Sequence, residues 1–307
     1  MLWKQTAAAV AGAQHYPSPA LYMVATPIGN LADIGLRALH VLVLVDAVAC
    51  EDSRVTSRLL RHFSIEKPLL TVHRHNERAA ADQVLQRLAG GARVAYASDA
   101  GTPAVSDPGA ALVRAVADAG YRVVPIPGPS SPTAALSVAG DTLAAGFRFG
   151  GFAPSKGAER QRAWDAACAD PAAQVWLEAP HRIAALATEW ARRFGSRPVT
   201  LCRELTKQFE SVVTLPASQL PQWLQGEPAR TRGEFVLVLH ALPPRRGASD
   251  AGDSETPGSA ESMRVLDVLM SELPLRQAVG LAVQLTGASR KALYAAALQR
   301  RDAGSPP

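Results

Sequence analysis

The sequence predicts an α/β fold, with two α/β domains followed by a small C-terminal helical module. From Leu21 onward, short apolar segments of strand length alternate with segments that repeat apolar residues at helical spacing. The short segments are almost continuously apolar, which is typical of strands that helices cover on both faces. Helices become sparser after Gly128, and a Pro/Gly/Ser-rich stretch precedes the last helical segment.

Residues 1–19 are predicted to form a flexible N-terminal extension. A single lysine followed by alanine-rich sequence faintly resembles a secretory signal, but its apolar part is too short and consists mostly of alanine. Residues 20–128 are predicted to form the first α/β domain. Its expected strands are Leu21–Ala25, Ala47–Glu51, Leu69–His73, Arg93–Ser98 and Arg122–Ile126, and its expected helices are Ser53–Phe63, Asn76–Ala89 and Gly109–Ala119. Two helix starts are expected where N-cap residues precede proline, at Asp107 and at Ser131.

Residues 129–241 are predicted to form a second, mixed α/β domain, in which the last three strands pair in antiparallel fashion. Its expected strands are Phe147–Phe152, Gln174–Glu178, Val199–Glu204, Phe209–Leu215 and Glu234–His240. Residues 242–262 are rich in proline, glycine and serine and lack apolar periodicity, so they are predicted to form a linker.

Residues 263–307 are predicted to form a helical module. Leu275 and Val279 fall on one helical face, Gly287 interrupts the pattern, and Ser289 is expected to cap a second helix that carries Leu293. Two short helices across a tight turn are compatible with a helix-turn-helix. The module has six basic and three acidic residues. Contact with nucleic acid and a hairpin that only packs are therefore both open.

Composition limits the classes of protein that fit this sequence. The chain has 307 residues, of which 48% are hydrophobic, and this excludes a wholly disordered protein. Lys and Arg total 32 against 27 Asp and Glu, a net charge of +5 that mildly favours an anionic partner. Three distant cysteines argue against a disulfide framework or a zinc site and favour the cytoplasm. The longest apolar stretch, residues 41–50, is half a membrane span.

Several common site motifs are missing. Neither GxGxxG nor GxxxxGK[ST] follows the first expected strand, which argues against a nicotinamide enzyme and a P-loop NTPase. A serine nucleophile elbow needs glycine where Pro132 stands. The segment Thr26–Asn30 still marks the edge of the sheet where α/β folds bind ligands, although an ordinary turn explains it equally well.

The segment that contains Asp99 is the most unusual one in the chain. Asp99 follows an expected strand and precedes a Gly/Pro loop, so its carboxylate is suited to hold ammonium or hydroxyl groups while loop backbone groups contact the rest of a ligand. The segment Pro127–Pro132 adds two hydroxyls at a helix start, which makes a polar and weakly positive wall.

Charged clusters also follow strands of the second domain. Glu178 lies near Arg182 in the sequence, and Arg203 lies near Lys207. These charged residues either form a second wall of a ligand-binding cleft or are paired with one another in solvent. His73, His75 and Glu77 have a spacing compatible with a metal site, but a polar rim of the cleft is the preferred interpretation, and no metal is expected.

Taken together, these segments resemble the tetrapyrrole methylase family of S-adenosylmethionine (SAM)-dependent methyltransferases. The resemblance runs from about Leu21 to Leu298, the linker excepted. The matching segments are Leu21–Asp33, Glu51–Arg54, His75–Glu77, Ser98–Pro103, Ser106–Gly109, Val124–Ser131, Glu178 with His181 and Arg182, Arg203–Lys207, Gly233–Val238 and Leu273–Leu298. The alanine-rich N-terminus and the linker are not shared features.

The resemblance implies the class III SAM methyltransferase fold, with SAM between the two α/β domains of a cytoplasmic homodimer. It implies transfer of the SAM methyl group to the ribose 2′-hydroxyl of a cytidine in the decoding region of 16S ribosomal RNA, either free or in the small subunit. Carried over by position, the SAM contacts are Pro27, Ser98, Asp99, Thr102, Ser130 and Ser131, with Glu178 and Phe235 closing the site.

A ribose hydroxyl is a weak nucleophile and gains from a base or a nearby cation. Lys207 and Glu204, oriented by Arg203, are the candidate catalytic residues. The basic residues expected to meet RNA phosphates, unless they are ordinary surface, are Arg54, Arg58, Arg61, Arg74, Arg290 and Lys291.

Two alternatives stay open. One keeps the fold and SAM but methylates a tetrapyrrole ring or a protein side chain. The other is a non-catalytic RNA-binding assembly protein. The basic C-terminal module argues against the first, and a failure to bind SAM would favour the second.

Overall fold

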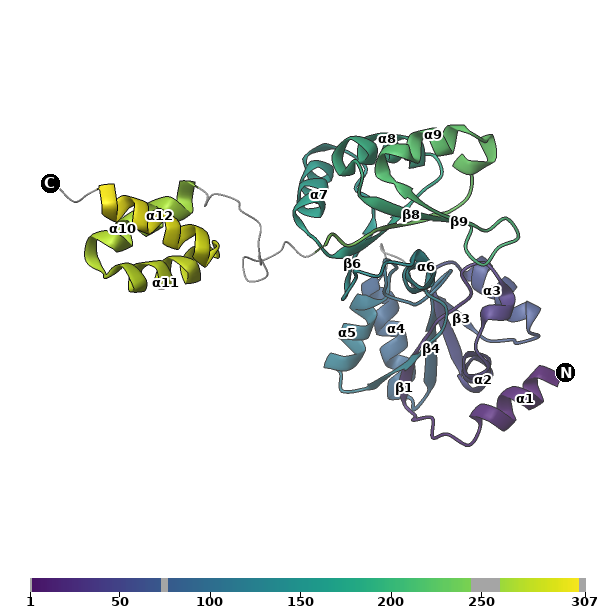
Figure 1. The fold of residues 1–307 in the computed structure, drawn as a ribbon. Coiled ribbons are helices and arrows are strands. Elements are labelled where there is room, and N and C mark those ends of the chain that lie inside the picture. The colour runs from purple at the N-terminus through teal and green to yellow at the C-terminus, as the bar shows by residue number, and fades with distance from the viewer. Residues whose placement is uncertain (1, 73–76, 244–259, 304–307) are drawn as a thin grey trace. The chain divides into compact units, whose positions relative to one another are not determined.

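The computed structural model describes residues 2–72, 77–243 and 260–303 (Figure 1). Its contacts divide the chain into two compact units, residues 1–242 and residues 243–307. The larger unit contains two five-stranded sheets, and the smaller one is helical in its described part. The α/β fold class predicted from the sequence is confirmed.

The first sheet is entirely parallel, with the strand order β3-β2-β4-β1-β5. The strands are β1 (Ala20–Val24), β2 (Ala47–Cys50), β3 (Leu69–Thr71), β4 (Arg93–Ala97) and β5 (Arg122–Ile126). Every residue of β2 is buried, as are the last four of β4. Helices cover both faces of this sheet, which is why its central strands are almost continuously apolar in sequence.

The helices of the first layer lie on opposite faces of this sheet (Figure 1). Helices α4 and α5 pack on one face, where Leu88 and Leu112 are fully buried with Tyr96 of β4. Helices α2 and α3 pack on the other face through Leu42 and Leu60. The helices are α1 (Leu2–Ala11), α2 (Leu36–Leu44), α3 (Ser53–His62), α4 (Glu77–Ala89) and α5 (Ala110–Asp118), with a 3-10 turn η1 (Leu31–Asp33).

The N-terminus differs from the flexible extension that the sequence predicts. Residues Leu2–Ala11 form helix α1, which packs along α2 and buries Ala7 and Ala11. Trp3 meets Phe63 edge-on, with ring centroids 5.8 Å apart. Alanine is the strongest helix former, and its small side chain lets α1 approach α2 closely, so an alanine-rich segment that lacks apolar periodicity still forms a packed helix.

The second sheet is mixed, with the strand order β6-β7-β10-β8-β9. Strands β6 and β7 are parallel, and the other neighbours are antiparallel. The antiparallel pairing predicted for the last three strands is thereby confirmed. The strands are β6 (Phe147–Phe152), β7 (Ala173–Glu178), β8 (Pro198–Arg203), β9 (Ser211–Pro216) and β10 (Phe235–Leu239).

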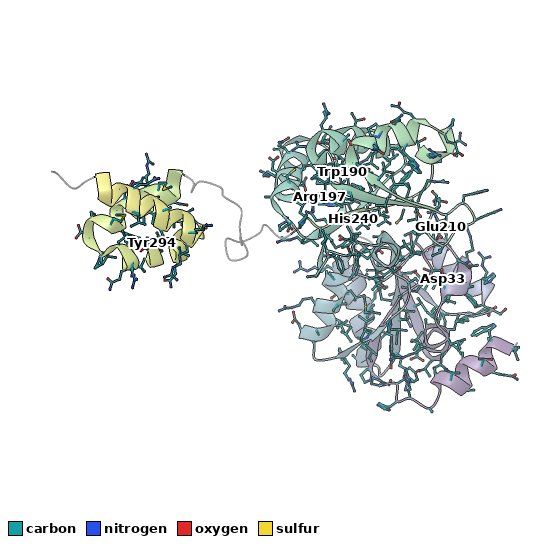
Figure 2. The ribbon with its side chains drawn as sticks, in the orientation of Figure 1. Asp33, Trp190, Arg197, Glu210, His240 and Tyr294 are labelled. Atoms are coloured by element: carbon teal, nitrogen blue, oxygen red, sulfur yellow. The ribbon has the colours of Figure 1, made fainter. Side chains whose placement is uncertain are left out.

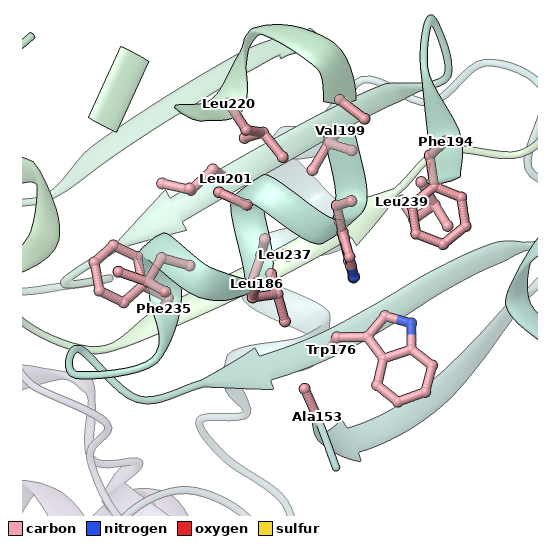
Figure 3. Packing of buried hydrophobic residues seen from close by; sticks show 14 of the residues in the cluster. Ala153, Trp176, Leu186, Phe194, Val199, Leu201, Leu220, Phe235, Leu237 and Leu239 are labelled. Atoms are coloured by element: carbon pink, nitrogen blue, oxygen red, sulfur yellow. The ribbon is translucent and has the colours of Figure 1, made fainter. Parts of the chain in front are cut away.

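Four helices cover the second sheet. They are α6 (Ser131–Ala139), α7 (Gly157–Ala169), α8 (Ile183–Phe194) and α9 (Leu220–Gln225), with 3-10 turns η2 (Ala217–Gln219) and η3 (Pro228–Thr231). Helices α7, α8 and α9 bury an apolar cluster against one face, in which Leu186 packs near Leu237 and Trp176 (Figure 3). Helix α6 packs on the other face, where Ala135 meets Val236. The second sheet is therefore covered by more helices than the sequence predicts.

Trp190 of α8 lies at the centre of this cluster and is fully buried (Figure 2). Its ring meets Trp164 and Phe194 edge-on, at centroid distances of 5.6 and 5.2 Å. Truncation to alanine leaves a cavity that the two flanking rings cannot fill. Trp190→Ala is therefore expected to lower the free energy of unfolding by about 3–5 kcal/mol, measured by urea denaturation. Exposed Arg162→Ala is the control, and an equal loss in both variants would contradict the prediction.

Arg197 holds the far end of the second sheet (Figure 2). Its buried guanidinium donates to the carbonyls of His240 (2.7 Å), Ala172 (2.9 Å), Ala167 (3.2 Å) and Asp170 (3.2 Å). Burial lowers the pKa of this guanidinium from its ordinary value. These bonds tie β8 to the segment between α7 and β7, so Arg197 serves the architecture rather than the site.

The smaller unit contains three helices in its described residues, one more than predicted. They are α10 (Ala260–Glu272), α11 (Leu275–Thr286) and α12 (Arg290–Ala303). Leu266, Val279 and Leu293 bring one residue from each helix into a common core. The predicted cap is present, because the Ser289 hydroxyl accepts a hydrogen bond from the Ala292 amide at 3.4 Å.

Helix starts were the weakest part of the sequence predictions. Asp107 does not cap α5, which begins at Ala110 after Gly109. Gly109 has φ +124°, a backbone conformation that side chains disfavour, and so the chain turns into the helix two residues later than the Asp-Pro pair suggests. Helix α6 begins at Ser131, with Ser130 rather than Ser131 at the N-cap.

Candidate active site

The topology places a reversal point between β1 and β4. The chain leaves β1 towards β2 on one side, and it leaves β4 towards β5 on the other. Open α/β sheets bind ligands outside the carboxyl ends of strands at such a point. The two segments that follow these strand ends are Thr26–Asn30 and Ser98–Pro103, both singled out from sequence.

Backbone hydrogen bonds lock these two segments together. The Thr26 amide donates to the Gly101 carbonyl at 2.9 Å, and the Gly101 amide returns a bond to Thr26 at 3.0 Å. The Thr26 hydroxyl donates to the Ser98 carbonyl at 3.1 Å, and that of Thr102 donates to the Pro129 carbonyl at 3.0 Å. The hydroxyls near the strand ends therefore hold three loops in a fixed arrangement.

A cavity of about 470 Å³ opens at this edge of the first sheet and reaches the second sheet. This volume lies within the ~300–1,000 Å³ typical of small-molecule sites. The first sheet and its loops contribute Ile28, Glu51, Asp99, Ala100, Val105, Ser106 and Asp107 to the lining. The second sheet, its helices and its loops contribute Ser131, Phe152, Leu177, Glu178, Ala179, Pro180, Leu205, Glu234, Phe235 and Val236.

Asp99 supplies a carboxylate to the first wall of the cavity. Its Oδ1 accepts a hydrogen bond from the Asp52 amide at 3.1 Å. Burial raises the pKa of Asp99 above its ordinary value, and the nearby Asp52 charge acts in the same direction, outweighing the lowering by that hydrogen bond and by Arg54. The ionised carboxylate therefore lacks a full set of partners and favours a cationic or hydrogen-bond-donating ligand.

Glu178 supplies a second carboxylate, at the end of β7. Its side chain is fully buried, and it pairs with Arg182 at 2.8 Å. The Glu178 Oε1 also accepts a bond from the Ala179 amide at 2.9 Å. The pair fixes Glu178 in place, with Phe235 of β10 directly opposite it in the ladder.

The loop after β8 forms the third wall of the cavity and contacts the segment that follows β1. The Asn30 amide donates to the Thr206 hydroxyl at 3.0 Å. A Cβ on Gly29 would lie 2.6 Å from Lys207 and 2.9 Å from the Leu205 carbonyl, so only glycine permits this approach. Glu204 and Thr206 both have positive φ, of 53° and 67°, which indicates a strained loop held from both sides.

Lys207 stands between two carboxylates in this loop. Its Nζ lies 2.9 Å from Glu204 Oε1 and 2.7 Å from Glu234 Oε2. Burial acts to lower the pKa of Lys207, but the hydrogen bonds to both carboxylates outweigh it and raise the pKa above the ordinary lysine value. For Glu204, burial acts to raise the pKa, but the Glu234 amide and Lys207 outweigh it and lower the pKa. Lys207 is thus a permanently charged cation rather than a proton acceptor.

The sequence predicts that Arg203 orients Lys207 and Glu204, but in the structure Arg203 forms no hydrogen bond or ion pair with either side chain. Its guanidinium donates instead to the Phe209 carbonyl at 3.0 Å, the Arg232 carbonyl at 3.3 Å and the Ser211 hydroxyl at 3.2 Å. It therefore holds the two ends of the loop. Arg203 therefore acts on the Lys207–Glu204 pair through the loop backbone and through its charge, which helps to lower the pKa of Glu204 after the larger contributions of the Glu234 amide and Lys207.

Of the eight residues expected at the SAM site, four line the cavity and four do not. Asp99, Ser131, Glu178 and Phe235 line the cavity. The remaining ones are absent from the lining among the described residues, and these are Pro27, Ser98, Thr102 and Ser130. Ser98 and Thr102 hold the loops as described above, while Pro27 and Ser130 lie beside lining residues.

Glu234 and Phe152 are two of the lining residues that were not expected from the sequence to belong to the site. Glu234 lines the cavity and follows Gly233, which has a φ of +89°. A Cβ at position 233 would lie 2.5 Å from Cγ of Glu204, so glycine is needed for the chain to turn here. The sequence signal for it was the Gly-Glu pair ahead of an apolar strand. Phe152 lines the cavity as well, and nothing in the sequence separates it from the aromatic core residues.

The arginines expected to meet RNA have different environments. Arg54 is paired with Asp52 at 2.6 Å, and hydrogen bonds from Arg54 lower the pKa of Asp52 to about 2. Arg58 and Arg61 are exposed on the same face of α3. Arg290 and Lys291 are exposed in the first turn of α12. Arg74 lies outside the described residues, as do His73 and His75.

In the described part of the chain, no group of three or more His, Cys, Asp or Glu side chains is placed to hold a metal ion. None of the described helices has the length and apolar character needed to span a bilayer.

Comparison with known proteins gives matches over most of the chain. Residues 20–221 match the family model for tetrapyrrole (corrin/porphyrin) methylases, and residues 256–301 match the RsmI C-terminal HTH domain. Ribosomal RNA small subunit methyltransferase I of Pseudomonas aeruginosa is 44% identical, over 92% of this chain and 97% of that protein.

Solved structures show the same fold at low sequence identity. Diphthine synthase has a TM-score of 0.56 at 16% identity, covering 72% of this chain and 90% of its own. The Thermus thermophilus uroporphyrin-III C-methyltransferase complexed with S-adenyl homocysteine has a TM-score of 0.50 at 19% identity, covering 71% and 96%.

Proposed function

The chain belongs to the tetrapyrrole (corrin/porphyrin) methylase family, and we propose that it transfers the methyl group of SAM to the ribose 2′-hydroxyl of a cytidine in the decoding region of 16S ribosomal RNA. The observation that carries the proposal is the cavity at the reversal point of the first sheet, walled by Asp99, Glu178 and the Lys207 loop. The 44% identity to a ribosomal RNA methyltransferase over nearly the whole chain supports RNA as the acceptor.

The cavity suits SAM in size and in chemistry. SAM supplies an electrophilic methyl group on a sulfonium, and it also carries an ammonium group and ribose hydroxyls. Asp99 and Glu178 provide carboxylates for these cationic and donor groups, while Ile28, Leu177 and Val236 provide apolar walls. A site of this kind, mostly apolar with a few fixed polar groups, is typical of small-molecule binding.

The residues around Lys207 are suited to activate the acceptor hydroxyl. Lys207 lies outside the lining, but its Nζ is 2.7 Å from Oε2 of the lining residue Glu234. From the edge of the cavity, Lys207 stabilises the negative charge that develops on the ribose oxygen, while Glu204 and Glu234 keep it charged. Glu234 lines the cavity and accepts the proton. The rigid loop holds the hydroxyl in line with the methyl group, which accounts for much of the rate of such a transfer. Arg203 maintains the loop, and Glu204 positions Lys207.

The test is methylation of ribosomal substrates. The purified chain is incubated with methyl-labelled SAM and with small ribosomal subunits or free 16S rRNA from cells that lack it. We expect label in one cytidine, recovered as 2′-O-methylcytidine by mass spectrometry of the RNA. If a tetrapyrrole or a protein is labelled instead of the rRNA, the proposed RNA acceptor is wrong. If the chain fails to bind SAM in a calorimetric titration, a non-catalytic role is favoured.

The first turn of α12 is proposed to contact RNA phosphates through Arg290 and Lys291. The double variant Arg290→Ala/Lys291→Ala is expected to weaken binding to small subunits roughly tenfold at moderate salt, because two phosphate contacts are lost. Equilibrium filter binding over a series of salt concentrations measures this. Arg276→Ala, an exposed arginine on α11, is the control. An unchanged affinity and salt slope in the double variant would assign the module a packing role instead.

Assembly and compartment stay predictions of the family resemblance. A homodimer in the cytoplasm agrees with the proposed ribosomal substrate, and sedimentation of the purified chain tests the assembly.

A further inference from the structure

A second cavity, of about 410 Å³, lies among the helices that cover the second sheet. It forms between the start of α7 and one side of α8 and is lined by Lys156, Arg160, Arg182 and Arg192, with Glu189 as its carboxylate. We call it the basic groove. Four cations against one lining carboxylate make it a strongly positive concavity.

The charges of the basic groove are only partly used within the protein. Arg160 pairs with Glu189 at 2.7 Å and donates to the Pro154 carbonyl at 2.6 Å. Arg182 pairs with Glu178 of the active site. Among the described residues, none forms an ion pair or hydrogen bond with the side chain of Lys156 or Arg192, and both side chains are exposed. Two positive charges therefore remain open to an anionic ligand.

The basic groove is joined to the active site through two connections. Arg182 lines the groove, while its partner Glu178 lines the active-site cavity. The same guanidinium donates to the Ala153 carbonyl, in the segment that runs from Phe152 to Lys156. Phe152 lines the active-site cavity, and Lys156 lines the groove. Four residues span at most ~14 Å, so the two sites are close neighbours.

A β-bulge turns Phe152 towards the active site. The register of β6 against β7 shifts between Phe149 and Gly151, so Phe149 pairs with Val175 while Phe152 pairs with Leu177. Regular alternation would place Phe152 and Phe149 on opposite faces. The extra residue puts both on the face that carries the cavity. The ring of Phe152 is 57% exposed there, a large apolar surface left uncovered.

An exposed ring followed by a positive groove is the arrangement that recognises single-stranded RNA, because bases stack on aromatic rings while phosphates follow the cations. We propose that the basic groove binds the phosphodiester backbone next to the methylated nucleotide, through Lys156 and Arg192, and that Phe152 stacks on a base at the mouth of the active site. The inference rests on the proposed function and identifies the path of its RNA strand.

The test compares Lys156→Ala/Arg192→Ala with Arg162→Ala, which removes an exposed arginine of α7 that does not line the groove. Binding of the full-length chain to small subunits that lack the methyl group is measured by filter binding over a range of salt concentrations. The double variant is expected to bind at least tenfold more weakly, with a log–log salt slope shallower by about 1.4. Arg162→Ala is expected to match the wild type, and calorimetry is expected to give the same SAM affinity for all three.

Failure of this inference is distinct from failure of the proposed function. If the wild-type chain methylates the rRNA and the double variant keeps its affinity and salt slope, the groove is overturned as an RNA site and the function stands. If the double variant loses binding to whole subunits but not to protein-free 16S rRNA, the groove contacts a ribosomal protein, and the inference is overturned in favour of that partner.

The stacking ring has its own test. Phe152→Ala is expected to raise the KM for subunits about tenfold to a hundredfold, and Phe152→Tyr is expected to restore it, because both rings stack. An equal KM for the alanine variant and the wild type would overturn the assignment of Phe152.

Discussion

Replacement of Lys207 by methionine is expected to lower kcat for methyl transfer about 10²–10³-fold. Methionine fills similar space but removes the charge that stabilises the developing oxyanion. Single-turnover kinetics at saturating SAM measure the loss. SAM affinity is expected to stay within about twofold of the wild type, because Lys207 does not line the cavity.

The matched control for this variant is Lys207→Arg, which keeps the charge between Glu204 and Glu234. It is expected to recover part of kcat, whereas Lys207→Met leaves two neighbouring carboxylates without their cation. Equal kcat values in the wild type and the methionine variant would remove Lys207 from the mechanism. A joint loss of SAM affinity and kcat would instead indicate collapse of the loop against Gly29.

Replacement of Asp99 by asparagine is expected to weaken SAM binding about tenfold to a hundredfold, because a charged acceptor becomes a neutral one. Asparagine keeps the oxygen that accepts the bond from the Asp52 amide, so the loop is preserved. Isothermal titration calorimetry measures the affinity. Val138→Ala, an exposed residue towards the end of α6, is the control, and an undiminished affinity in Asp99→Asn would contradict the assignment of Asp99.

The same substitution is expected to stabilise the ligand-free protein at neutral pH. Burial raises the folded-state pKa of Asp99 above the unfolded value, so the shift favours folding only while the carboxyl is protonated. This contribution is present below the unfolded pKa and is lost as the pH rises through the folded-state pKa. Asp99→Asn is neutral at every pH. Urea denaturation is therefore expected to show a gain over the wild type at pH 7 that disappears well below the ordinary aspartate pKa.

The sequence predicted the strands of both sheets more accurately than the helices. The central strands of the first sheet, β1, β2 and β4, are mostly buried and so are almost continuously apolar in sequence. Helix α2 was missed because Leu36–Leu44 is apolar on nearly every side, which removes the periodicity by which a helix is recognised. Helix α1 was missed because its packing depends on small alanines rather than on an apolar stripe.

The candidate site was predictable in part. Asp99 could be chosen from sequence because it directly follows an apolar strand. Glu178 ends another such strand, and the family resemblance implied its place at the site. Glu234 and Phe152 were not chosen, since each reaches the cavity through a local backbone feature, and only Glu234 has a sequence signal, the Gly-Glu pair ahead of an apolar strand. For Glu234 this feature is the positive φ of Gly233, and for Phe152 it is the bulge at Gly150–Gly151.

The sequence by itself determined the α/β class, the two strand sets, the cap of α12 and the family to which the chain is similar. These follow from local periodicity and from motifs that are contiguous in the chain. Only the tertiary structure decided that Lys207 is held charged between Glu204 and Glu234, that Ser98 and Thr102 brace loops, and that the basic groove adjoins the active site. Such properties depend on distances between residues that are remote in sequence, and periodicity along one chain carries no information about those distances.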